Sequence, residues 1–158
     1  MQRKPRRRAG GREQASARLA AADDFLRGSQ IAHDEGLWRS ATSNAVLAAI
    51  AAGDVAGYCV VGERSASADH RAALAILSES GANRDVRQAF RWLLDQKGAT
   101  QYLEDSVVDA GIAGTAIEYA ADLVAHAHAM FEAADTSGWP RSSTPTSDLM
   151  SRLASDEH

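Results

Sequence analysis

The chain has 158 residues, of which 45% are apolar and 24% are charged, which predicts one compact domain with a hydrophobic core. Aromatic residues make up only 6%, alanine is the commonest residue, and only three prolines occur. Because alternating runs of β-branched residues are also missing, this composition excludes an all-β or doubly wound fold and predicts an all-α protein.

Positive charge is concentrated at the start of the chain. Six of the 17 basic residues come before Glu13, the first acid, which leaves 11 basic residues against 21 acidic ones in the rest of the sequence. These six are Arg3, Lys4, Arg6, Arg7, Arg8 and Arg12. We expect residues 1–12 to form a disordered basic arm that contacts RNA, DNA or anionic lipid, or aids solubility, on an acidic body that repels phosphate.

The predicted location is the cytoplasm. Cys59 is the single cysteine and has no partner for an intramolecular disulfide, which favours a reducing compartment. The basic start is not followed by a secretory hydrophobic segment, and charged or polar residues interrupt every long apolar stretch. We therefore expect no association with a membrane.

Residues 13–135 are predicted to form an up-and-down bundle of four to five helices. The first helix runs from Glu13 to Asp34, and the second runs from Leu37 to Val61 after a turn at Gly36. The second helix has a stripe of mostly small residues that permits close packing, formed by Trp38, Ala45, Ala49, Ala52, Ala56 and Val60. Residues 62–68 are expected to be a loop before a third helix that begins near Ser67, ends at Ser80 and is followed by Gly81.

The later helices are indicated by capping residues. Asn83 is a good N-cap for a fourth helix, which is expected to fade near Gly98. The spacing of Ser106 and Asp109 is that of a capping box, and predicts a fifth helix that continues to about Ala134. Serine, threonine, glycine and proline then predominate, so residues 136–158 are predicted to be a flexible polar tail.

The sequence contains no motif that is typical of a metal or a cofactor. His126 and His128 diverge on a helix, whereas zinc-binding pairs on one face are three or four residues apart. The phosphate-binding and dinucleotide-binding glycine patterns, HExxH and CxxC are all missing, and no serine lies on a strand-to-helix elbow. We therefore expect no metal, no cofactor and no serine hydrolase chemistry.

Several polar residues are candidates for a site. Asn44 and Asp54 lie in an Ala-rich helix and face a cleft, a dimer axis or solvent. Asp69 and His70 are adjacent at a helix start, where Asp69 either caps the helix or lines a cleft with an acid/base partner from elsewhere. Lys97 and Tyr102 lie near the end of the fourth helix, where a lysine and a tyrosine ordinarily interact with the helix dipole and pack at the rim.

Three segments resemble the HEPN superfamily, and one of them is residues 62–77 with Asp69, His70 and Arg71, which are similar to the linker and short helix of some bacterial members. Residues 39–52, Arg-Ser-Ala-Thr-Ser-Asn-Ala-Val-Leu-Ala-Ala-Ile-Ala-Ala, are similar to its second helix, a polar entry followed by small residues. Residues 93–102, Leu-Leu-Asp-Gln-Lys-Gly-Ala-Thr-Gln-Tyr, are similar to the stretch in which a basic residue precedes the last core helix. The resemblance extends over about Ala15 to Ala134 in the order of the helices.

This resemblance implies a dimeric helical bundle. Active members of the superfamily are metal-independent ribonucleases, often toxins paired with a nucleotidyltransferase or another antitoxin, with an Arg and a His four to six residues later at the dimer axis. On the matching positions, Lys97 replaces the arginine and Tyr102 replaces the histidine. Lysine loses the bidentate fork for phosphate, and tyrosine, with a pKa of about 10, is a poor base at neutral pH.

Two hypotheses follow. The first is a non-catalytic HEPN-like homodimer that acts as a binding or partner module of a toxin–antitoxin or defence-type system. The second is a divergent endoribonuclease in which Lys97 holds phosphate, Tyr102 donates a hydrogen bond to RNA and His70 supplies acid/base function. We favour the first, because the motif is altered and the acidic body repels RNA.

Overall fold

The computed structural model describes residues 6–66, 70–102 and 107–141, with the side chains of residues 70 and 99–102 left out. Its elements, in chain order, are β1 (Arg7–Ala9), α1 (Arg12–Asp34), α2 (Trp38–Val60), β2 (Glu63–Ser65), α3 (His70–Glu79), α4 (Arg84–Tyr102) and α5 (Ala110–Ser137). The prediction of an all-α bundle is confirmed, with one two-stranded sheet added to it.

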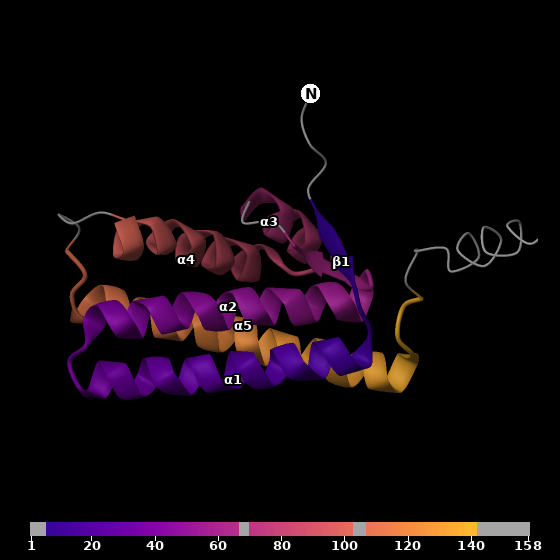
Figure 1. The fold of residues 1–158 in the computed structure, drawn as a ribbon, viewed down its shortest axis with the longest axis horizontal. Coiled ribbons are helices and arrows are strands. Elements are labelled where there is room, and N and C mark those ends of the chain that lie inside the picture. Colours follow the sequence, from indigo (N-terminus) through magenta and orange to yellow (C-terminus); the bar gives the residue numbers. More distant parts are fainter. Residues whose placement is uncertain (1–5, 67–69, 103–106, 142–158) are drawn as a thin grey trace, which may run out of the picture.

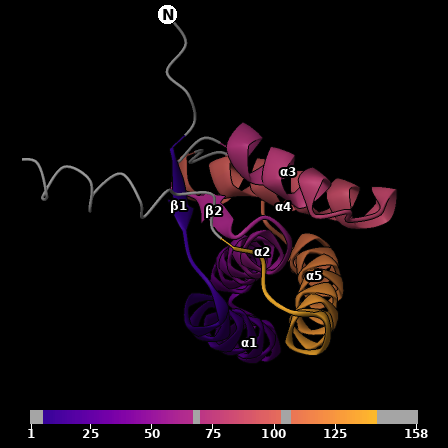
Figure 2. The same cartoon turned by 90° about the vertical axis from the view of Figure 1, so that its right-hand side faces the viewer.

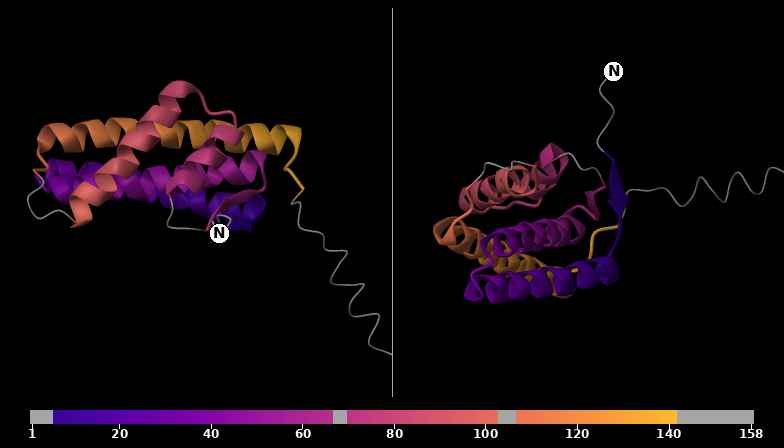
Figure 3. Two further views of the ribbon diagram at one scale, coloured as in Figure 1. Left: turned by 90° about the horizontal axis from the view of Figure 1, so that it is seen from above. Right: turned by 60° about the vertical axis from the view of Figure 1, so that its left-hand side comes forward.

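The helices form two layers. α1, α2 and α5 lie side by side along the long axis of the molecule, and α3 and α4 cover the other side of α2 (Figures 1 and 2). α1, α2, α4 and α5 alternate in direction, because α1 and α4 end where α2 and α5 begin, at one end of the bundle (Figure 1). Seen from above, α4 crosses the long helices diagonally (Figure 3, left). The architecture is therefore an up-and-down bundle of four helices, with the short α3 as a fifth.

α2 is the central helix, because small residues on all of its sides let the neighbouring helices pack closely against it. It packs against α1, α5, α4 and α3, and every residue from Ala51 to Cys59 is buried. A Cβ atom on Gly53 would lie 3.3 Å from the ring of Phe90, and one on Gly57 would lie 2.4 Å from the carbonyl oxygen of Glu63. Both glycines therefore allow a close approach that a larger residue would prevent.

Among the described residues, α2 is the one helix that is long and apolar enough to cross a membrane by length and composition alone. Its apolar window has a mean hydropathy of 1.4, and 67% of that window is buried inside the molecule. A helix that is apolar on every side is also what the centre of a helical bundle requires.

The start of the chain departs from the predicted disordered arm. β1 pairs antiparallel with β2, with Arg7 opposite Ser65 and Ala9 opposite Glu63, so part of the segment expected to be a loop is also a strand. α1 then begins at Arg12. The prediction of disorder was wrong for this part of the arm because its hydrogen-bond partner lies far away in the sequence, where local composition gives no signal.

The bounds of α1 and α2 and the end of α3 agree with the prediction to within a residue, while the predicted start of the third helix near Ser67 lies outside the described residues. Asn83 caps α4 as expected, since its side-chain oxygen accepts a 2.9 Å hydrogen bond from the backbone NH of Val86. α4 continues through Gly98 to Tyr102 instead of fading. α5 is capped by Asp109, whose carboxylate accepts a 2.9 Å hydrogen bond from the NH of Ile112, while Ser106 lies outside the described residues.

The first residues of the predicted polar tail also belong to the bundle. α5 continues to Ser137, and Trp139 packs edge to face on Phe131 with 5.2 Å between ring centroids. Trp139 lies against the main core cluster. The structured domain therefore extends past residue 135 to at least Trp139, and residues 142–158 lie outside the described part of the chain.

Candidate functional site

The two residues at the motif positions belong to one continuous helix. Lys97 is half-buried on α4, and Tyr102 is the last residue of that helix. Positions five apart in an α-helix are separated by about 140° around the axis and about 7.5 Å along it. Because α4 does not break at Gly98, the helix itself does not place these two positions on one face.

His70 is the first residue of α3, while Asp69 lies outside the described residues. α3 lies beside β1 and β2, whereas α4 ends at the opposite end of the bundle (Figure 1). The predicted catalytic residues therefore belong to separate places in the fold of one chain: Lys97 and Tyr102 near the end of α4, and His70 at the start of α3.

Two arginines of the basic arm are held in ion pairs within the chain. Arg7 binds Glu79 of α3 through two hydrogen bonds of 2.8 and 3.1 Å, and lies 3.6 Å from Glu63. Its guanidinium holds the pKa of Glu79 below the ordinary value, through the hydrogen bonds and the opposite charge. Arg6 and Arg8 are exposed, and Arg3 and Lys4 lie outside the described residues.

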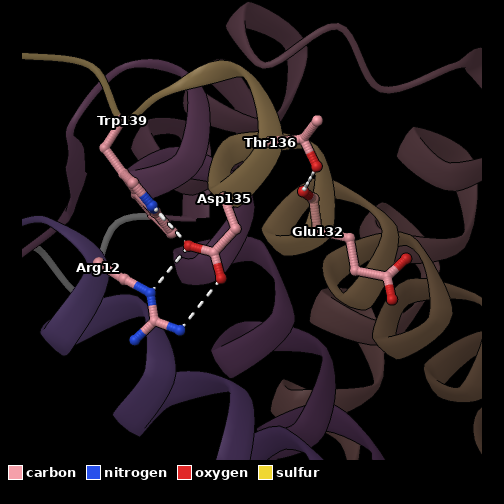
Figure 4. A network of polar contacts seen from close by, with 5 residues as sticks. All are labelled: Arg12, Glu132, Asp135, Thr136 and Trp139. Atoms are coloured by element: carbon pink, nitrogen blue, oxygen red, sulfur yellow. Dashed lines mark hydrogen bonds and ion pairs between the residues drawn. The ribbon is translucent and has the colours of Figure 1, made fainter.

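Arg12 joins the start of α1 to the end of α5 (Figure 4). Its guanidinium donates hydrogen bonds of 2.8 and 3.1 Å to Asp135, which also accepts one of 2.9 Å from the indole NH of Trp139. Both donors keep the pKa of the Asp135 carboxyl below its usual value. Arg7 and Arg12 therefore fasten the first residues to the bundle, a role that the sequence interpretation as a nucleic-acid contact did not include.

Asp54 is a buried carboxylate in the most tightly packed part of α2. It is 7% exposed, and its Oδ2 accepts a 2.9 Å hydrogen bond from Nε of Arg18 on α1 and forms an ion pair with Nη2 of the same side chain at 2.7 Å. Burial raises the pKa of Asp54, while the charges of Arg18 and Arg64 oppose that rise. This pair joins α1 to α2 inside the bundle, so Asp54 faces a neighbouring helix of the same chain.

Asn44 also lies at the contact between α1 and α2. A Cβ atom built on Gly28 of α1 would lie 3.5 Å from the side-chain nitrogen of Asn44. Gly28 therefore makes room for the amide of Asn44. This contact explains why a glycine occurs inside α1, although glycine weakens a helix. Asn44 and Asp54 both occupy helix contacts within the bundle.

The two histidines of α5 have separate environments. His128 lies 2.8 Å from Asp23 of α1. The Nε2 atom of His126 is buried without a hydrogen-bond partner among the described residues, and burial lowers the pKa of this imidazole. In the described part of the chain no group of three or more His, Cys, Asp or Glu side chains could hold a metal ion.

The surface around the first half of α4 holds two depressions that the sequence interpretation missed. One, of about 310 Å³, is lined by Arg84, Arg87, Gln88 and Arg91. The other, of about 430 Å³, is lined by Asn83, Asp85, Val86, Gln88, Ala89, Tyr119 and Asp122. The sequence signal was the spacing of the three arginines, since residues at i, i+3 and i+7 share one helix face.

Comparison with known proteins adds no family to these observations. No protein-family model matches the chain, and no curated protein matches it.

Proposed function

We propose that the protein is a non-catalytic, HEPN-like homodimer that acts in the cytoplasm as the binding or partner module of a toxin–antitoxin or defence-type system. The observation that carries this proposal is the unbroken α4, which separates Lys97 from Tyr102 by five helical positions. An acid/base pair acting on one RNA phosphodiester needs groups within hydrogen-bond reach of the same atoms.

The chemistry of the residues supports the same conclusion. Lysine holds phosphate as a point charge without the bidentate geometry of arginine, and the phenol of tyrosine has an ordinary pKa of about 10. His70, the remaining candidate base, begins α3, and α3 lies away from the end of α4 (Figure 1).

A surface for a second copy of the chain lies where α1 ends and where α2 and α5 begin. Three large apolar residues are exposed there, Ile31 by 52%, Leu37 by 56% and Val107 by 78%, and we call them the apolar end patch. A core cluster of Ala32, Ala41 and Ala113 joins the three helices at this end. Exposed apolar side chains at one end of a bundle favour a protein contact, and α4 ends at the same end (Figure 1).

The first test measures oligomeric state by sedimentation velocity. We expect the wild type to be a dimer and the Leu37→Ser, Val107→Ser variant to be a monomer at the same concentration. Val60→Ser is the matched control, because Val60 is also exposed but lies at the other end of α2. A monomeric wild type, or a dimer unaffected by the double substitution, would contradict the proposed dimer surface.

The second test incubates the protein with mixed RNA in excess EDTA, beside a Lys97→Ala, Tyr102→Phe variant. We expect no cleavage by either protein. Cleavage by the wild type that the variant loses would establish the alternative, a divergent metal-independent endoribonuclease. Capture of a protein partner with the wild type, reduced by the end-patch substitutions, would identify the binding role.

A further inference from the structure

We propose that the surface formed by the start of α4 and the neighbouring turns of α5 binds single-stranded nucleic acid. Arg84, Arg87 and Arg91 hold its phosphates, and the adjoining depression takes a base. This α4 surface belongs to a single protomer, so the proposal does not depend on the dimer.

The three arginines are available to a ligand. Arg84 and Arg91 are exposed and Arg87 is half-buried. Arg87 donates a 3.2 Å hydrogen bond to the backbone oxygen of Ala82, and none of the three forms an ion pair with a described residue. By contrast, Arg7, Arg12 and Arg18 each pair with a carboxylate. Positive charge left unpaired on an otherwise acidic body favours an anionic ligand.

The spacing of the arginines suits a polyanion. Seven residues of α-helix separate Arg84 from Arg91, a distance of about 10 Å along the axis, which corresponds to about three phosphates of a stacked strand at about 3.4 Å each. Guanidinium groups bind phosphate oxygens through paired hydrogen bonds, which a lysine at the same place would not provide.

The adjoining depression has the features of a base pocket. It shares Gln88 with the arginine-lined depression, and Tyr119 of α5 lies in its wall. A partly exposed aromatic ring offers a surface on which a base stacks. Asn83, Gln88 and the carboxylates of Asp85 and Asp122 supply hydrogen-bonding groups at the rim.

These features favour a nucleic acid over an acidic peptide or a membrane. The carboxylates of Asp85 and Asp122 repel an acidic peptide but accept hydrogen bonds from the exocyclic amines of adenine, cytosine and guanine. The arginine-lined depression has no apolar side chain in its wall that would insert into a bilayer.

The test measures fluorescence anisotropy with a labelled single strand of about 12 nucleotides, rich in adenine and cytosine, at salt from about 50 to about 200 mM. RNA and DNA strands are compared, and the tighter binder identifies the source of the ligand. A polyglutamate peptide of equal length is the competitor. We expect unlabelled RNA or DNA to displace the labelled strand at a lower concentration than the peptide does.

The variants separate the two halves of the α4 surface. Arg84→Gln with Arg91→Gln is expected to weaken binding about tenfold and to reduce the salt slope by about 1.4, since each phosphate contact on a single strand contributes about 0.7. Tyr119→Leu is expected to weaken binding about tenfold with the salt slope unchanged, while Tyr119→Phe keeps the affinity. Arg27→Gln, at an exposed position on α1, is the control.

The proposal is overturned if the wild type does not bind at the lowest salt, if the double arginine variant keeps the wild-type affinity and slope, or if the Arg27→Gln variant loses as much. Equal competition by the peptide would also overturn it. The helicity of each variant is measured by circular dichroism. A variant with wild-type helicity has lost binding through lost contacts and not through unfolding.

Discussion

Replacing Arg18 by methionine is expected to lower the free energy of unfolding, because the Asp54 carboxylate is buried and Arg18 is its partner. In the native protein, the Arg18 guanidinium donates a 2.9 Å hydrogen bond to Asp54 and lies 2.7 Å from it in an ion pair, and the Asp54 side chain is 8% exposed. Methionine keeps a long apolar side chain at this position but leaves the carboxylate without its hydrogen-bonded counter-charge. A buried charge that loses its partner is strongly destabilising.

The magnitude follows from the geometry. Two unit charges with centres about 4 Å apart attract each other by about 4 kcal/mol at an effective dielectric constant of about 20. Because the side chain of Arg18 is itself 35% exposed, water screens part of this attraction. We therefore expect Arg18→Met to lower the free energy of unfolding by about 2–3 kcal/mol at neutral pH.

The effect depends on pH with a definite sign. Burial raises the pKa of Asp54 above the value of the unfolded chain, and loss of Arg18 raises it further. A raised pKa gives stability that is present below the unfolded pKa and is lost as the pH rises through the folded pKa. The variant should therefore be close to the wild type near pH 4, about the ordinary aspartate pKa, and fall behind it toward pH 7.

Urea denaturation followed by circular dichroism at both pH values measures this difference. Arg27→Met is the matched control, because Arg27 is exposed on the same helix. Adding Asp54→Asn to Arg18→Met should recover most of the lost stability at neutral pH. The reasoning is refuted if the Arg18→Met deficit is equal at the two pH values, or if Arg27→Met destabilises the protein as much.

Three further outcomes are expected from local geometry. Gly57→Ala would place a Cβ atom 2.4 Å from the carbonyl oxygen of Glu63 and should cost about 1–3 kcal/mol in urea denaturation, whereas Gly98→Ala, with nothing within 4 Å, should stabilise α4 by about 0.5–1 kcal/mol. Equal effects would contradict this packing. Burial raises the pKa of Cys59 to about 11, so a thiol reagent should label it at neutral pH only after unfolding, and rapid labelling of the native protein would refute its burial. Asp109→Ala removes the N-cap of α5 and should lower the free energy of unfolding by about 1 kcal/mol, while Asp109→Asn should keep most of it; equal losses in the two variants would contradict the cap.

The sequence predicted the helices because their signals are local. Small apolar residues at three- and four-residue spacing indicated α2, and the side chain of Asn83 indicated the start of α4. Gly98 misled the prediction at the end of α4, since a single glycine weakens a helix by only about 1 kcal/mol, which did not end it. β1 and β2 have three residues each, which is too short for an alternation of apolar and polar residues to indicate a strand.

The candidate residues were less predictable because their partners are remote. Asp54 was recognised as a polar residue in an Ala-rich helix, but its partner Arg18 lies on another helix. The arm was recognised as basic, but the ion pairs of Arg7 with Glu79 and of Arg12 with Asp135 could not be read from either segment alone. The resemblance to the HEPN superfamily and the dimer remain proposals.

The sequence by itself determined the all-α class and the position of most helices, since helix formation depends on periodicity, capping and propensity within about a dozen residues. Tertiary structure alone decided that α2 is central, that Arg7 and Arg12 are fastened to the bundle, and that three arginines of α4 form no ion pair with a described residue. The physical reason is that burial and pairing depend on which distant side chains meet, and a charge is satisfied or left free only once the chain has folded around it.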